Sequence, residues 1–216
     1  MSVWWRRWSR ILLVVLLGLA LVAGVPAIRT AALRTMGGAL VVDEPVESAD
    51  IIVVPRWAGG AGAIDAADLV HRGIAGRVAV LPEPPTPAER ELTRRGIFYH
   101  DQTADLVQLL HTLGVAKVDV IPDPAAGTQA EAQVLLSWCD RHQFRSIVVI
   151  SAPDHSRRVR RALQRAWLGH PTNVIVRSAR YSPFDPNRWW ETRDGIRIAI
   201  VELQKLVLDV VRHPMS

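Results

Sequence analysis

Cysteine, metal-binding spacings and the common catalytic signatures are all scarce in this sequence. The chain of 216 residues holds one cysteine, Cys139, so an intramolecular disulfide cannot form. Its seven histidines are scattered without metal-ligand spacing, and we expect no metal site. A Gly-x-Gly-x-x-Gly fingerprint and a Gly-x-Ser-x-Gly elbow are also missing. The sequence therefore carries no signature of a disulfide scaffold, a metalloenzyme, a Rossmann dehydrogenase or an α/β-hydrolase.

Positive charge is present but local. The formal net charge is +5, and arginines gather near the N-terminus and between residues 157 and 165. A basic patch is one indicator of nucleic-acid binding. Neither an aromatic-interleaved strand nor a zinc spacing accompanies it, so we expect no nucleic-acid partner.

One long apolar run stands near the N-terminus. Residues 11–28 contain no charged side chain over eighteen positions. As a helix they would extend roughly 27 Å, enough to cross the hydrocarbon core of a bilayer. Tryptophans and arginines in residues 1–10 form the flank expected at a cytoplasmic membrane surface. We predict a single transmembrane anchor with the N-terminus in the cytoplasm and the main domain outside. A cleaved signal peptide is the alternative, although Val25-Pro26-Ala27 matches a cleavage site poorly.

The rest of the chain alternates short β-branched runs with helical periodicity. We interpret residues 29–48 as a connector and residues 49–213 as one domain. Strands are predicted at residues 49–55, 77–81, 118–121, 147–150 and 173–176. Helices are predicted at 64–73, 87–95, 103–113, 128–142, from 155 onward, and 196–211, with a glycine-rich loop at 56–62. This order predicts an α/β fold of the Rossmann-like type: a mostly parallel sheet of about five strands between two helical layers. In the last helix we expect a buried face made of Ile200, Leu203, Val207 and Val210.

The segment from Ser146 to Arg161 is the most informative part of the domain. The buried run Ile147–Ile150 leads through Ser151 to Asp154 into a helix that begins at His155. The loop then lies at the carboxyl edge of the sheet, where open α/β folds bind ligands. His155 and Arg158 are three residues apart and share a helix face, so they could form an anion-binding corner. An ordinary solvated basic helix is the competing interpretation.

Thr128 and Glu131 have two possible roles. Their spacing fits a capping box at the start of the helix 128–142, which would be purely local. Because the loop before them also reaches the carboxyl edge of the sheet, they could instead line the pocket.

Several of these pieces resemble the YdcF, SanA and ElyC proteins, a family of bacterial envelope-associated proteins also described as domain of unknown function 218. The resemblance covers about residues 43–211, and its most specific element is the His-x-x-Arg of His155 and Arg158. Further matching positions are Asp50 before the first strand, Leu69 to Gly73, Thr128 and Glu131, Ser151, Trp189 and Glu202. The family's glycine-rich loops after the first two strands are replaced by Pro55-Arg56-Trp57 and Pro82-Glu83-Pro84.

The resemblance implies a membrane-tethered, Rossmann-like domain and a role in cell-envelope biogenesis or maintenance. Together with the convergence of the strand-to-helix loops, it predicts a ligand site at His155, Asp154, Arg158, Thr128, Glu131, Ser151, Asp50 and Trp189, in which His155 and Asp154 are the candidates for acid–base chemistry. S-adenosylmethionine is a possible cofactor by this resemblance alone.

Three functions stay open. The first is an extracytoplasmic domain that binds a small anionic ligand, a phosphorylated or nucleoside-like molecule. The second is an envelope scaffold whose pocket is degenerate. The third is a nucleotide or S-adenosylmethionine binder that faces the cytoplasm. Whether a reaction is catalysed is left undecided by the sequence.

Overall fold

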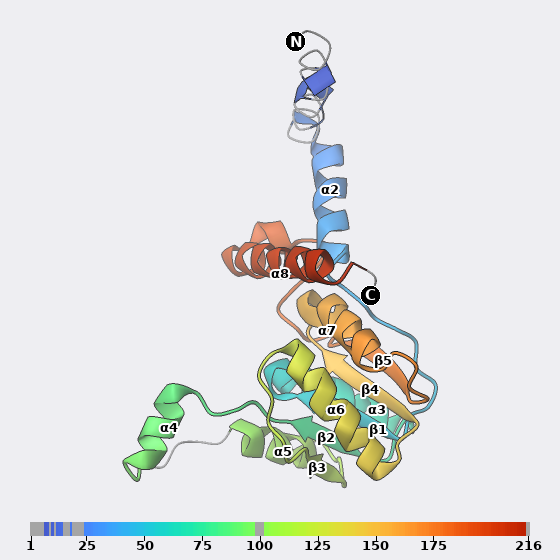
Figure 1. Cartoon of the computed structure of the whole chain (residues 1–216), viewed down its shortest axis with the longest axis vertical. Coiled ribbons are helices and arrows are strands. Elements are labelled where there is room, and N and C mark those ends of the chain that lie inside the picture. The colour runs from blue at the N-terminus through green and yellow to red at the C-terminus, as the bar shows by residue number, and fades with distance from the viewer. Residues whose placement is uncertain are drawn as a thin grey trace.

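The chain forms an α/β domain around a five-stranded, all-parallel sheet (Figure 1). The computed structural model describes residues 24–97 and 102–214, together with a few positions before residue 24. The strands lie in the order β3-β2-β1-β4-β5. Their bounds are Ile51–Pro55 (β1), Val78–Leu81 (β2), Val118–Val120 (β3), Ser146–Ser151 (β4) and Asn173–Ser178 (β5). All four pairings are parallel, as the alternation of strands and helices predicts.

Helices cover both faces of this sheet because the central strands are apolar on both faces. Every residue of β1 and β2 is buried. Alternate side chains, such as Ile51 and Val53, face α6 (Thr128–His142) and α7 (Pro153–Ala166). Their neighbours Ile52 and Val54 face α3 (Gly59–His71) and α5 (Gln102–Thr112). The predicted α/β class with two helical layers is therefore confirmed for the described residues. The short polar helix α4 (Pro87–Arg94) lies apart from these layers (Figure 1).

The glycine-rich segment after β1 is helical, which corrects the predicted loop at residues 56–62. A 3-10 turn, η1 (Arg56–Ala58), leads directly into α3 at Gly59. A Cβ on Gly62 would lie 2.7 Å from the Cβ of Ala58 and 3.1 Å from Val54 Cγ1. The small residues therefore let the helix begin tight against the strand, and this packing outweighs their low helix propensity.

Helix α6 begins as predicted at Thr128, but the predicted capping box is absent. Gly127 is the N-cap, with φ of 89°, and no side chain caps the helix. Since Thr128 is already inside the first turn, its hydroxyl and the Glu131 carboxylate are available for contacts with other parts of the domain.

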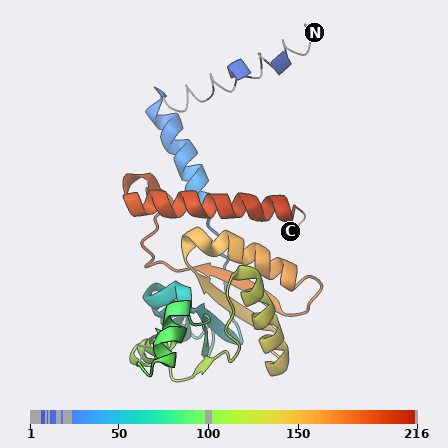
Figure 2. The same cartoon turned by 60° about the vertical axis from the view of Figure 1, so that its left-hand side comes forward.

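The last helix, α8 (Arg193–Arg212), corrects the prediction of its buried face. Ile200, Val207 and Val210 are exposed by 47%, 60% and 42%, and Leu203 is half-buried. The buried residues of α8 are instead Gly195, Ala199 and Glu202. The helix lies across the outside of α7 (Figure 2), and it packs mainly on α7 and η2.

Part of the predicted connector is also helical. Helix α2 (Pro26–Gly38) starts with a proline at its first turn and ends against η2 (Trp189–Glu191) and the loop before it. A Cβ on Gly37 would lie 2.2 Å from the carbonyl oxygen of Pro186. After α2 the chain runs along β5, where the amide of Glu44 donates to the carbonyl of Val176 at 2.9 Å.

Among the described residues, no helix is both long and apolar enough to cross a membrane. Half of the predicted anchor 11–28, and most of its flank 1–10, lie outside the described residues. The anchor therefore stays a prediction.

Candidate functional site

The candidate site lies between the neighbouring strands β1 and β4. From β1 the chain continues to β2 on one side, and from β4 it continues to β5 on the other side, so the strand order reverses at this point. Ligands of open α/β sheets bind in the crevice at such a point. Here η1 follows β1 and the N-terminus of α7 follows β4, so Trp57 and His155 meet with ring centroids 4.6 Å apart.

His155, Arg158 and Thr128, predicted from sequence as site residues, are in direct contact. Arg158 Nη1 donates to Thr128 Oγ1 at 2.7 Å, and Arg158 Nε donates to Glu202 Oε2 at 3.1 Å. His155 Nδ1 lies 3.2 Å from the same Glu202 oxygen. The carboxylate of Glu202, supplied by α8, therefore holds both His155 and Arg158 of α7.

The ring nitrogens of His155 limit where its proton can be. Nδ1 is 3.2 Å from Glu202 Oε2 and 2.8 Å from Arg158 Nη2, and it cannot donate to one and accept from the other at once. Nε2 lies 3.5 Å from the Thr128 hydroxyl, which already accepts from Arg158 and so has its proton to give. We assign the proton to Nδ1, which then donates to the Glu202 carboxylate while Nε2 accepts from Thr128; this arrangement leaves Arg158 Nη2 without an acceptor on the ring.

Glu202 is the electrostatic centre of this cluster. Its side chain is 10% exposed, and burial alone would raise the pKa of the carboxyl. Hydrogen bonds from His155 and Lys205 and the charge of Arg158 outweigh burial and lower the pKa of Glu202 to about 2. Glu202 is therefore an anion at any physiological pH, and its role is to fix its partners in place.

Glu131 joins the cluster through Trp57. The indole Nε1 of Trp57 donates to Glu131 Oε2 at 3.3 Å. Burial raises the pKa of the Glu131 carboxyl, and the bond from Trp57 offsets only part of that effect. Glu131 is thus a carboxyl with raised proton affinity near the Thr128 and Arg158 side chains.

Asp154 lies in the first turn of α7. Burial is the main cause that raises the pKa of its carboxyl, and the negative charge of Glu202 adds to the increase. Asp154 and Glu202 therefore have pKa values shifted in opposite directions. Such a divergence is typical of acid–base sites, but it also occurs in structural ion-pair networks.

The remaining predicted site residues lie elsewhere. Ser151 is fully buried, and its hydroxyl donates to the carbonyl of Ala152 at 3.0 Å. Asp50 stands at the amino edge of the sheet, where its carboxylate accepts the amide of Arg145 at 2.6 Å. Trp189 packs against α2, and its indole donates to the carbonyl of Leu33 at 2.8 Å. These three residues do not reach the His155 cluster.

A second ionic cluster follows the first along α8. Asp209 Oδ2 accepts from Arg161 Nε at 2.6 Å, and Asp209 Oδ1 accepts from Arg165 Nη2 at 2.8 Å. Burial opposes ionisation of Asp209, but the hydrogen bonds from both arginines prevail and its pKa is lowered. Arg165 also donates to Gln129 in the first turn of α6 at 3.1 Å. The sequence analysis matched Glu202 through the family resemblance without giving it a role in the site, and it missed Asp209. The seven-residue spacing of these two acids on α8 equals that of Arg158 and Arg165 on α7.

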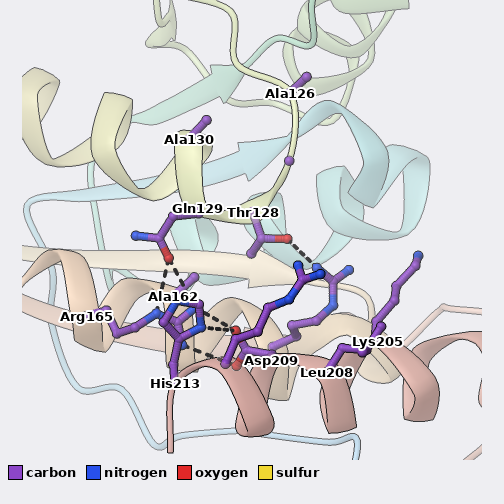
Figure 3. Close-up of a pocket in the computed structure, with 13 residues that line it drawn as sticks. Ala126, Thr128, Gln129, Ala130, Ala162, Arg165, Lys205, Leu208, Asp209 and His213 are labelled. Atoms are coloured by element: carbon purple, nitrogen blue, oxygen red, sulfur yellow. Dashed lines mark hydrogen bonds and ion pairs between the residues drawn. The ribbon is translucent and has the colours of Figure 1, made fainter. Parts of the chain in front are cut away.

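A cavity of about 590 Å³ opens beside both clusters, between the start of α6, α7 and α8 (Figure 3). Gly127 to Ala130 form one wall, so the N-terminal end of α6 borders the cavity. Cationic side chains form much of the rest: Arg158, Arg165, Lys205 and Arg212. Asp209 also lines the cavity, and Glu202 pairs with Arg158 and Lys205 beside it, so four cations face two carboxylates. A positively charged cavity at a helix N-terminus fits an anionic ligand.

No group of three or more potential metal ligands occurs among residues 24–97 and 102–214 or the few described before them. The chain matches no protein-family model and no curated protein.

Proposed function

We propose that this protein is a membrane-anchored member of the YdcF-like group that binds a small phosphorylated molecule of the cell envelope. The cavity at the N-terminus of α6 carries this proposal, because it joins helix amide groups with the guanidinium groups of Arg158 and Arg165. Guanidinium groups and helix N-termini are the two protein features best suited to phosphate. The domain would lie on the extracytoplasmic side, as the arginine distribution around residues 11–28 favours.

His155 and Thr128 are the groups that could move a proton in this site. In the assigned arrangement His155 Nε2 accepts from Thr128, and Glu202 holds the other ring nitrogen. A phosphate seated on Arg158 would lie beside the Thr128 hydroxyl, because the two side chains are 2.7 Å apart. Binding of a phosphate needs no proton transfer from either group.

The test is ligand retention by the full chain purified in detergent. Denaturation followed by mass spectrometry should release a phosphorylated compound from the wild type. Arg212→Gln should weaken retention and Arg158→Ala should abolish it, since both residues line the cavity. Arg197→Gln is the matched control, because Arg197 is an exposed arginine of the same helix outside the cavity.

An envelope scaffold is the second candidate, and the occupancy of the site by its own side chains favours it. Glu202 already satisfies His155, Arg158 and Lys205, so the cluster can serve to fasten α8 to the domain. On this interpretation the wild type carries no phosphorylated compound and does not bind added pyrophosphate. Arg158→Ala would then lower the melting temperature without changing any ligand signal.

A further inference from the structure

The outward face of α8 is an apolar stripe. Ile196, Ile200, Val207 and Val211 recur at spacings of four, seven and four residues and are exposed by 38%, 47%, 60% and 72%. Such spacing places them on one side of the helix. Glu202 and Asp209 occupy the opposite side, where they contact α7. In the described part of the chain these four side chains stay exposed, and an exposed apolar stripe of this length is unusual for a water-soluble surface.

The charges on α8 fit an anionic surface. All residues of α8 are described, and its acidic residues are Asp194, Glu202 and Asp209. Two of them face inward, so Asp194 is the one exposed acid, and it is paired with Arg197. The exposed basic residues next to the stripe are Arg193 and Arg197, whereas Lys205 and Arg212 lie on the side of α8 that lines the cavity. An apolar face bordered by cations is the pattern of helices that lie in a lipid headgroup layer.

Helix α2 connects this face to the apolar run at the N-terminus. It leaves the domain on the side of α8 that is turned away from the sheet (Figure 2). Leu33 of α2 packs in the same cluster as Leu203 of α8. Leu33 follows Ile28, the last residue of the run, by five positions, or roughly 7.5 Å of helix. That length is close to the thickness of one headgroup layer, about 5–7 Å. Helix α8 is therefore held at the depth of the headgroups if the run spans the bilayer.

We propose that α8 lies flat on the membrane, with Ile196, Ile200, Val207 and Val211 inserted among the lipid headgroups. This inference depends on the membrane anchor in the proposed function and is independent of the ligand. It makes the domain a body with two points of attachment, the N-terminal run and the outer face of α8. The cavity beside Arg158 and Arg165 is then held close to the membrane surface in a fixed orientation.

The test measures the depth of single labelled positions in the full chain, reconstituted into vesicles of zwitterionic and anionic lipids. An environment-sensitive fluorophore is attached at Val207→Cys on α8. Thr112→Cys on α5 is the exposed control, because α5 lies at the end of the domain away from α8 (Figures 1 and 2). Leu13→Cys reports on the anchor itself. Burial raises the pKa of the native Cys139 to about 12, so this thiol does not compete for the label, and unmodified protein checks this.

The expected result is a blue-shifted emission from the fluorophore at Val207→Cys. Lipids that carry a quencher near the headgroup should also quench this emission. Thr112→Cys should show neither effect, and Leu13→Cys should be quenched from deep in the bilayer. If Leu13→Cys is quenched and Val207→Cys behaves like the control, the anchor holds and the inference about α8 is wrong. If Leu13→Cys is not quenched, the anchor itself fails. A blue shift at Val207→Cys without lipid quenching would overturn the inference in favour of a second copy of the chain on this face.

Discussion

The two faces of α8 reverse the usual distribution of side chains in a surface helix. The inner face presents the carboxylates of Glu202 and Asp209 to the arginines of α7, while the outer face presents Ile200 and Val207 to the surroundings. In α7 the distribution is ordinary, with Val159 and Leu163 buried against the sheet. The difference teaches that α8 is attached to the domain by ion pairs and hydrogen bonds as well as by the apolar contacts of Ala199 and Leu203, and that much of its apolar surface stays exposed.

The largest expected effect comes from removing the carboxylate at the centre of the inner face. Glu202→Ala leaves His155 and Arg158 without their shared acceptor in a nearly buried place. Breaking a buried ion pair on one side costs about 3–5 kcal/mol. Urea unfolding of the full chain in detergent should show a loss of that size.

Glu91→Ala is the control for this loss. Glu91 also pairs with two arginines, Arg94 and Arg95, but on the exposed surface of α4. Its removal should leave the unfolding midpoint unchanged. Equal effects of the two substitutions would show that the ion pairs of Glu202 stabilise the fold no more than exposed ion pairs do.

Acid should weaken the inner face in the same way. The pKa of Glu202 is about 2 in the folded chain, against an ordinary value of 4.5. A carboxyl with a depressed folded pKa contributes stability that is fully present above its unfolded pKa and is lost as the pH falls toward its folded pKa. The contribution here is about 3 kcal/mol, from 1.36 kcal/mol per pKa unit.

Unfolding measured across pH 7 to 2 in wild type and Glu202→Gln should therefore converge at low pH. Wild type should be the more stable protein above pH 4.5, and the gap should close toward pH 2. A gap that stays constant with pH would mean that shape, and not charge, holds α8 in place.

Asp209→Asn tests the second cluster and should have a smaller effect. The amide keeps the shape of the side chain but loses the charge that faces Arg161 and Arg165. We expect a loss of about 2 kcal/mol, typical of hydrogen bonds to charged groups. Because its partners differ from those of Glu202, the loss should add to that of Glu202→Gln in the double variant. A strongly non-additive result would show that the two clusters form one unit.

Polar substitution on the outer face should have the smallest effect on folding. Val207 is 60% exposed, so Val207→Ser removes little buried apolar area, and its unfolding free energy should stay within about 0.5 kcal/mol of wild type. Ala199→Leu on the buried side of the same helix should cost about 1–3 kcal/mol through overpacking. A large destabilisation by Val207→Ser would mean that the outer face is part of the core.

The strands and the layers could be predicted from sequence because their signals are local. Buried parallel strands such as β1 and β4 are continuous β-branched runs that are too short for a buried helix. Whether the apolar stripe of α8 faces the domain or the outside could not be predicted. An apolar stripe indicates that a helix has an apolar contact, but it does not identify the contacting partner. The deciding information is the complementarity between Glu202 and Arg158, which lie far apart in the chain.

In the site, too, the residues placed by local spacing could be predicted and those placed by tertiary contacts could not. His155 and Arg158 share a helix turn, so their proximity could be predicted from spacing, and Thr128 was placed by the loop that precedes it. Asp50 and Trp189 were included through the family resemblance, and the structure places them away from the cluster, at Arg145 and Leu33. The contact of Trp57 with Glu131 could not be found, because it depends on how closely η1 follows β1.

Helix α8 forms a wall of the cavity on one side and the boundary of the domain on the other. An α-helix with its side chains is about 10–12 Å across. A phosphate bound between Arg158 and Arg165 would therefore lie about one helix diameter from the apolar stripe, whatever group the phosphate is attached to. If α8 lies on the membrane as proposed, this distance is the shortest linker that would let a lipid-linked phosphate reach the cavity while its hydrocarbon chain stays in the bilayer.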